Sequence, residues 1–255
     1  MTGGQVNEKV FTEVRGGVLL VELNRPDARN AIDTDVADGL IEAVTRLDRD
    51  PALVVGVLAG RGRGFCSGMD LKSFAKAGVP KGLENFLWGG ARKPLVCAIE
   101  GFALAGGLEL ALTCDLIVAA TDAKLGIPET KVGLFAAGGA LLRLPRRLPY
   151  GVAMELALTG DTITGEEAHA YGLVTRVAEP GNALDTALAL AARIAANAPL
   201  AVAATKRLIR ETQGRTEEEF VDFQRPFMKE VFRSNDAKEG PRAFAEKRPP
   251  DWSGT

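Results

Sequence analysis

Short runs of apolar residues recur along the chain, and longer segments with helical periodicity separate them. Most of the runs are rich in Val, Ile and Leu and are bounded by turn-forming residues, which is typical of buried strands. They cover residues 18–23, 53–58, 95–99, 115–119 and 173–177. The clearest helical pattern lies at residues 34–49, where one face carries Val36, Leu40, Ile41, Val44 and Leu47. Strands and helices therefore alternate, which predicts an α/β fold.

The spacing of the first three predicted strands indicates a repeated unit. These strands begin at residues 18, 53 and 95, which are 35 and then 42 residues apart. Spacing of this kind favours a repeated supersecondary unit over a sheet with a nucleotide-binding first turn. Residues 78–90 (GVPKGLENFLWGG) are glycine-rich and irregular, and we expect a mobile wall there.

The last quarter of the chain has a different pattern. After Asn197 the strand signal stops, and Pro199 stands in the first turn of a predicted helix. Thr216 and Glu219 form a capping box ahead of a further helix with an aromatic face. Such helices must pack on the body of the protein or on another subunit to cover that face. We therefore predict a core at residues 1–197 and a helical subdomain at residues 198–255.

Composition narrows the class of protein. The 255 residues are 46% hydrophobic and 25% charged, as in an ordinary globular protein. A net charge of -2 gives no basic field for nucleic acid or anionic lipid, so a small partner is favoured. We expect no membrane span and no export signal, because the apolar runs are short and the N-terminus lacks the signal-peptide pattern. Three cysteines without disulfide or metal-site spacing favour a reducing compartment, so we expect a cytoplasmic protein.

Residues 101–116 (GFALAGGLELALTCDL) place a carboxylate in an apolar helix. Glu109 follows a double glycine by two residues and has apolar neighbours on both sides. An ionised carboxylate is costly to bury alone, so an embedded glutamate is neutral, paired or facing a cleft. A Glu109 that reaches solvent or pairs with an arginine is the alternative.

The two glycines before Glu109 suggest an oxyanion hole. Amide groups at a helix start lack helical partners, and a missing side chain at Gly106 lets a ligand oxygen approach them. Such a donor stabilises negative charge that develops in a transition state. The alternative is a glycine that allows close packing of the helix against a strand.

A second glycine-rich segment, residues 60–74 (GRGRGFCSGMDLKSF), offers another donor. Asp70 is placed to cap a helix that begins at Leu71, which leaves the amide of Met69 exposed at the helix start. The segment lacks the spacing of a dinucleotide-binding fingerprint, and we reject that interpretation. Cys66 and the single histidine, His169, are candidates for a nucleophile and base, but a lone histidine is more often a packing residue.

Glu129 is ordinary when taken alone. It follows Pro128, so it belongs to an extended or turn dipeptide just after a predicted strand. A solvated loop glutamate is the favoured interpretation of such a residue without further evidence.

These segments together resemble the crotonase, or enoyl-CoA hydratase/isomerase, superfamily over nearly the whole chain. The blocks occur in the family's order: LNRPDARNAI (23–32), GFCSGMDLK (64–72), KPLVCAIEGFALAGGLELALTCDL (93–116), LGIPETKVGL (125–134), GGALLRLPR (138–146) and EGPRAFAEKR (239–248). The resemblance implies a crotonase-like spiral of repeated ββα units. It also implies a C-terminal helical region that mediates trimers, often paired into hexamers.

The resemblance also implies roles for individual residues. The oxyanion donors fall on the backbone amides of Met69 and Gly106, and the two hydratase carboxylates fall on Glu109 and Glu129. Water addition needs one group to activate water and another to protonate the α-carbon, so the presence of both favours an enoyl-CoA hydratase. No metal and no separate cofactor is implied. The implied contacts to the CoA portion are Ala28, Cys66, Gly68, Asp70, Leu71 and Lys72, with Phe244 and Lys247 reaching a neighbouring subunit's site.

Other functions stay open at this stage. Ala136 and Ala137 replace a Pro-Gly pair found in many hydratases of the family, so the acyl group is not defined. The segments 138–150 and 239–248 look more like the carnitinyl-CoA dehydratase branch, which makes a dehydratase or a double-bond isomerase an alternative. Phe86, Leu87 and Trp88 would then be pocket walls. A non-catalytic acyl-CoA-binding or RNA-binding protein is the remaining alternative, and the absence of net basic charge disfavours RNA.

Overall fold

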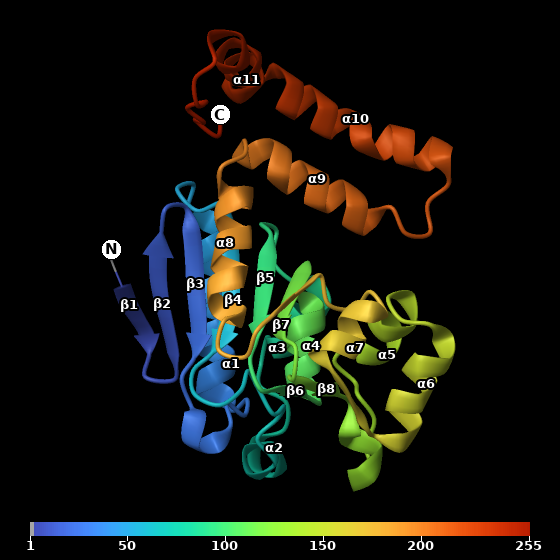
Figure 1. Cartoon of the computed structure of the whole chain (residues 1–255). Helices are drawn as coiled ribbons and strands as arrows, with labels where there is room; N and C mark the ends of the chain where they lie inside the picture. The colour runs from blue at the N-terminus through green and yellow to red at the C-terminus, as the bar shows by residue number, and fades with distance from the viewer. Residues whose placement is uncertain (1–2) are drawn as a thin grey trace.

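The computed structural model describes residues 3–255 and contains two β-sheets surrounded by helices (Figure 1). The strands are β1 (Gly3–Asn7), β2 (Val10–Arg15), β3 (Val18–Leu23), β4 (Val55–Gly60), β5 (Leu95–Ile99), β6 (Phe102–Leu104), β7 (Leu116–Ala120), β8 (Lys124–Gly126), β9 (Thr162–Thr164) and β10 (Arg176–Ala178). The α-helices are α1 (Thr34–Arg49), α2 (Leu71–Ala77), α3 (Leu83–Gly89), α4 (Gly106–Thr113), α5 (Ala140–Arg143), α6 (Tyr150–Thr159), α7 (Gly165–Ala170), α8 (Ala183–Ala195), α9 (Pro199–Glu211), α10 (Glu217–Arg233) and α11 (Asn235–Glu246). Short 3-10 helices are η1 (Pro26–Ala28), η2 (Pro128–Val132) and η3 (Leu144–Arg146).

The larger sheet has the strand order β1-β2-β3-β4-β5-β7-β10. Its strands are parallel from β3 onward, whereas β1, β2 and β3 pair antiparallel. The strands predicted near residues 18, 53, 95 and 115 are confirmed. The last prediction was wrong in its bounds, because β10 begins only at Arg176. The amides of Leu173 and Val174 donate instead to the carbonyl of Ala168, so these buried residues close the turn after α7.

The smaller sheet reveals the repeat. It has the order β6-β8-β9, and single parallel bridges, Ile32 to Met69 and Cys66 to Ala103, extend it toward the first half of the chain. Each of β3, β4, β5 and β7 is thus followed by a short second strand or bridge and then by a helix. These are the repeated ββα units of the expected spiral, and the predicted fold class is confirmed.

Helices cover both faces of the larger sheet. On one face, α1 begins at its cap Asp33 and buries Val36, Leu40 and Leu47. On the other face, α8 approaches closely because small side chains, among them Ala187, pack against valines of β3, β4 and β5.

Residues 78–90 do not form the irregular segment expected from the sequence, since α3 lies within them. Leu83, Phe86 and Leu87 supply its buried face, and the flanking glycines only bound the helix.

The last three helices extend beyond the end of the sheet as an arm, coloured orange to red in Figure 1. The predicted capping box of Thr216 and Glu219 is present at the start of α10. No residue of α9 or α10 is buried, and large apolar side chains stay exposed along the arm: Ile209, Val221, Met228 and Phe232. We therefore keep residues 198–255 as a proposed separate subdomain.

No single helix within residues 3–255 has both the length and the apolar character needed to cross a membrane. The helices α8 and α9 meet those criteria only as a pair, and that pair is bent by 109°.

Candidate active site

Two backbone amides, those of Met69 and Gly106, lie side by side where the second and third repeats of the spiral meet. The parallel bridge uses the amides of Ile32 and Asp70, which leaves the amide of Met69 without a partner in the described chain. The amide of Gly106, the first residue of α4, also lacks one there. A Cβ added to Gly106 would lie 3.5 Å from the Met69 nitrogen. The two donors predicted from the sequence are therefore close enough to share one oxygen.

The residue before Gly106 has an unusual backbone. Ala105 has φ 51° and ψ −129°, a conformation that costs an alanine about 1–3 kcal/mol. Its own amide donates to the carbonyl of Gly126 at 3.0 Å, which anchors α4 to β8. The strained residue therefore fixes the plane of the peptide that carries the Gly106 donor.

The double glycine serves two different purposes. A Cβ on Gly107 would lie 2.3 Å from the carbonyl oxygen of Cys66, so this glycine allows α4 to pack against the neighbouring chain segment. A Cβ on Gly106 would meet nothing nearer than 3.5 Å. Close packing thus explains Gly107, and an open approach to the donors explains Gly106.

This difference predicts unequal effects on stability. Gly107→Ala should destabilise the fold by about 1–3 kcal/mol, the usual cost of overpacking, because the contacted atom belongs to the backbone. Gly106→Ala should change the free energy of unfolding by less than about 1 kcal/mol, since its methyl group makes only ordinary contacts. Urea denaturation of the two variants measures the difference, and equal midpoints would contradict it.

Glu109 is only 5% exposed and lies one helical turn after Gly106, on the same face of α4. Its Oε1 accepts a hydrogen bond from the amide of Ala140 at 3.1 Å. A Cβ on Gly138 would come within 2.6 Å of its Oε2, so the glycine-rich turn before α5 forms a cradle for this carboxylate. Burial raises the pKa of Glu109, while the cradle amides and the charge of Arg143 oppose that rise. Glu109 is therefore neither solvated nor held mainly by an arginine.

Glu129 lies on η2, directly after β8, and its Oε2 is buried with no hydrogen-bond partner among the described residues. Burial raises the pKa of Glu129 to about 7, against the effect of its own backbone amide, and the negative charge of Glu109 adds to the rise. The solvated loop alternative therefore fails. Within residues 3–255, no group of three His, Cys, Asp or Glu side chains is arranged to hold a metal ion.

Sequence reasoning missed Arg143, which supports this part of the site. Its guanidinium donates to the carbonyl oxygens of Leu87 and Gly138, and it lies 5.6 Å from the ring centre of Trp88. It thus ties α3 to the cradle of Glu109. The signal was present in the sequence, because a charge embedded in the apolar run LLRL is as unusual as Glu109 in its own helix.

The residues implied for CoA contact occupy varied positions. Leu71 and Lys72 are exposed on α2, and Ala28 is half-buried at the end of η1. Cys66 is fully buried, its Sγ donates to the carbonyl of Asn30 at 3.1 Å, and burial raises its pKa to about 12. A thiol of this kind is a poor nucleophile, and the Nδ1 of His169 instead lies 2.9 Å from the carbonyl of Val174. The Cys66 and His169 pair therefore has no support.

Two further residues implied for CoA contact lie in the arm. Phe244 is 87% exposed on α11, and Lys247 ends that helix with a left-handed backbone. Figure 1 shows α11 and α2 at opposite ends of the molecule. Phe244 and Lys247 are thus not brought to the site of their own chain.

Comparison with known proteins identifies the family of the chain. The family model for enoyl-CoA hydratase/isomerase matches residues 13–255. The chain is 43% identical to the enoyl-CoA hydratase EchA19 of Mycobacterium tuberculosis, with 95% of both chains covered. It is 38% identical to a carnitinyl-CoA dehydratase of Proteus mirabilis, with 98% of this chain and 100% of the relative covered. The crystal structure of the enoyl-CoA hydratase EchA1 from Mycobacterium marinum matches with a TM-score of 0.94 and 54% identity, over 98% of this chain and 100% of that one. The chain therefore belongs to the enoyl-CoA hydratase/isomerase family.

Proposed function

We propose that this protein is a hydro-lyase that adds water reversibly to a 2-enoyl-CoA thioester. The observation that carries the proposal is a pair of carboxyl groups in unlike environments near two free amides: Glu109 is buried and Glu129 is partly buried. Glu109 accepts from a backbone amide, whereas Glu129 has a buried oxygen without a partner. Two titratable groups with different surroundings are what acid and base roles in one reaction require.

In the proposed mechanism, the thioester oxygen accepts hydrogen bonds from the amides of Met69 and Gly106. Attack of water on the β-carbon moves negative charge onto that oxygen, and each donor stabilises the resulting enolate by about 3 kcal/mol. Amide donation favours the ionised form of Glu109, which deprotonates the attacking water. Glu129 holds its proton up to a pH of about 7 and delivers it to the α-carbon.

This assignment predicts a specific pH dependence. The active enzyme carries one proton on the pair: as water adds, Glu129 gives its proton to the α-carbon and Glu109 takes one from the water, so the pair still holds one proton. Because hydration consumes no net proton, kcat/KM should follow the same bell-shaped curve in both directions. The basic limb should lie near pH 7, where Glu129 loses its proton while Glu109 is ionised.

The measurement compares hydration of crotonyl-CoA with dehydration of 3-hydroxybutyryl-CoA between about pH 5 and pH 9. Above the basic limb, both rates should fall about tenfold per pH unit. A flat profile through pH 8 would contradict a shared proton.

We further propose that CoA is held by residues near the N-terminus of α2, together with Ala28 and residues of a second subunit. Lys72 offers a mobile positive charge for a phosphate group.

The exposed apolar side chains of the arm support assembly into a trimer or a pair of trimers, in which Phe244 and Lys247 reach a neighbouring site. The three cysteines are free and buried, which supports a cytoplasmic location. No metal or separate cofactor takes part in the proposed reaction.

Dehydration of a functionalised acyl-CoA is the second candidate, and the 38% identity to a carnitinyl-CoA dehydratase favours it. The same two carboxyl groups catalyse both directions, so the substrate decides between the functions. A panel of enoyl-CoA and hydroxyacyl-CoA thioesters tests both. If crotonyl-CoA and longer 2-enoyl-CoAs keep their enone absorbance, simple hydration is wrong. Acyl-CoA binding without turnover of any thioester would favour a non-catalytic binding protein.

A further inference from the structure

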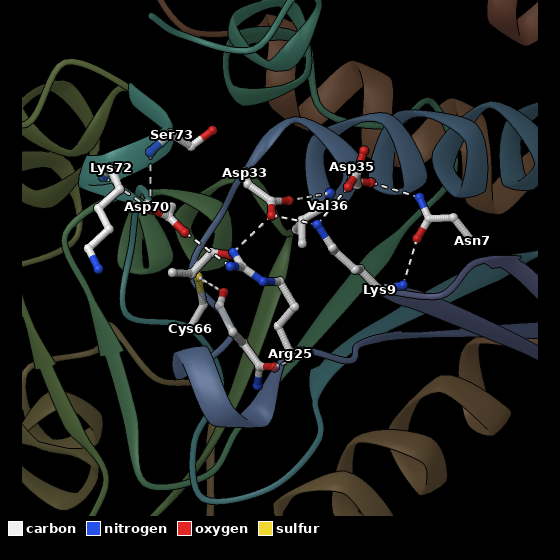
Figure 2. A network of polar contacts seen from close by, with 12 residues as sticks. Asn7, Lys9, Arg25, Asp33, Asp35, Val36, Cys66, Asp70, Lys72 and Ser73 are labelled. Atoms are coloured by element: carbon white, nitrogen blue, oxygen red, sulfur yellow. Dashed lines mark hydrogen bonds and ion pairs between the residues drawn. The ribbon is translucent and has the colours of Figure 1, made fainter. Parts of the chain in front are cut away.

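Arg25 connects the caps of two helices in a network of ion pairs (Figure 2). One guanidinium nitrogen lies 3.0 Å from Oδ2 of Asp70, which caps α2. The other lies 3.1 Å from Oδ2 of Asp33, which caps α1, and donates to the carbonyl of Ala31 at 2.8 Å. One side chain thus joins segments 45 residues apart in sequence.

The Asp70 end of this network is next to the oxyanion hole. Asp70 directly follows Met69, whose amide is one of the two free donors. The two carboxylate oxygens of Asp70 have separate tasks: Oδ1 accepts from the amides of Lys72 and Ser73, and Oδ2 binds Arg25. Movement of Asp70 would therefore turn the peptide that carries the Met69 donor.

The other contacts of residue 25 hold the strand segment that pairs with Met69. The Arg25 amide donates to Oδ1 of Asn30 at 2.9 Å, and the Asn30 side-chain amide donates to the carbonyl oxygen of Gly64 at 2.9 Å. Ile32, two residues further on, forms the bridge on either side of Met69. Backbone and side chain of Arg25 therefore restrain both segments of this bridge.

The charges in the network are not equally replaceable. Asp33 has a second cation, since its Oδ2 lies 2.7 Å from the Nζ of Lys9, which also reaches Asp35. Arg25 is the only cation paired with Asp70 within residues 3–255. Loss of Arg25 would thus free the Asp70 carboxylate but leave Asp33 paired.

We propose that Arg25 is a positioning residue for catalysis, which holds the Met69 amide in the oxyanion hole through Asp70. This inference rests on the proposed function, because it assigns a task to the same oxyanion hole. Arg25 itself makes no contact with the acyl group in this scheme. A lysine cannot replace it, because a single ammonium group lacks the planar fork that reaches both carboxylates and Ala31 together.

The test measures turnover by three variants, Arg25→Met, Arg25→Lys and Asp70→Asn. Lys9→Met is the matched control. Arg25→Met and Arg25→Lys should lower kcat for crotonyl-CoA by about 10- to 100-fold, as expected for a displaced catalytic group, with a smaller change in KM. Asp70→Asn keeps an acceptor for the α2 cap and loses the charge that binds Arg25, so it should show a similar fall. The double variant that combines Arg25→Met with Asp70→Asn should have a kcat no lower than that of either single variant. Lys9→Met removes a cation from the same network away from Met69 and should stay within about twofold of the wild type.

A second readout separates positioning from general damage to the fold. Butyryl-CoA labelled with carbon-13 at its carbonyl is saturated and cannot be hydrated, and its infrared carbonyl stretch falls when the hole donates hydrogen bonds. Bound to Arg25→Met, the stretch should lie at a higher frequency than in the wild type, while Lys9→Met should match the wild type. Unchanged kcat and an unchanged stretch in Arg25→Met would overturn the inference and leave the proposed function intact. A wild-type protein that hydrates no enoyl-CoA would overturn both.

Discussion

Glu129→Gln is expected to lower kcat for crotonyl-CoA hydration by about 10²- to 10⁴-fold, the range of a positioned general acid. Glutamine has nearly the same shape, yet it cannot release a proton to the α-carbon. The buried Oε2 of Glu129 has no hydrogen-bond partner in the described chain, so the substitution breaks no side-chain contact of that atom. KM should therefore change much less than kcat, and steady-state kinetics with crotonyl-CoA measures both.

Glu109→Gln is the matched comparison and should cause a loss of similar size. Its carboxylate accepts from the Ala140 amide, and a correctly oriented glutamine oxygen can still accept that bond. The double variant should be far less impaired than the product of the two single effects predicts, because both groups serve one proton transfer sequence. Turnover within tenfold of the wild type in either single variant would contradict the assignment of an acid/base pair.

Glu129→Gln should raise the stability of the protein above neutral pH, although it lowers the activity. The folded protein raises the pKa of this carboxyl from 4.5 to about 7, so the native state favours the protonated form. The wild type therefore has its full stability below about pH 4.5 and loses part of it as the pH rises through 7. Glutamine stays neutral, so the variant should melt at a higher temperature than the wild type at pH 8 and close to it at pH 4.5. Equal melting temperatures of the variant and the wild type at pH 8 would contradict the raised pKa.

Local sequence patterns correctly predicted the helices and strands that interactions between neighbouring residues determine. The strand at Leu95–Ile99 matches its apolar run, and α2 begins at Leu71 because Asp70 caps it. Residues 78–90 misled the prediction, since glycines at both ends concealed an apolar face of only three residues. The strand predicted at 173–177 failed for a related reason, because Leu173 and Val174 are apolar but bond to the end of α7.

In the candidate site, too, some features follow from the local sequence and others depend on contacts between distant segments. A glycine at a helix start predicts a free amide, so Gly106 was accessible to sequence reasoning. The sequence could not separate Gly106 from Gly107, because the difference is the close approach of Gly107 to Cys66, a residue far earlier in the chain. Contacts from Arg25 to Asp70 and from Ala140 to Glu109 span 45 and 31 residues, and no periodicity reports on such pairs. Only the arrangement of the repeats brings them together.

Gly68→Ala is expected to lower kcat by about 100-fold, because it displaces at least one of the two oxyanion donors. Gly68 has φ +100°, which alanine rarely adopts, and its added Cβ would lie 3.0 Å from the nitrogen of Gly106 and 2.9 Å from the Cβ of Ala105. The first atom is a donor and the second belongs to the strained residue that orients it. Relief of the contact must therefore move the Gly106 peptide, the Met69 peptide or both.

The control for Gly68→Ala is Gly181→Ala, which isolates the cost of the backbone conformation. Gly181 has φ +89°, and a Cβ there would meet nothing within 4 Å. Both alanines carry the penalty of a left-handed backbone, about 1–2 kcal/mol, so both variants should melt earlier than the wild type. Only Gly68→Ala should also lose turnover when both are assayed well below their melting temperatures. If the two variants kept equal kcat values, the spacing of the Met69 and Gly106 amides would not control the reaction, and enolate stabilisation would have to come from other groups.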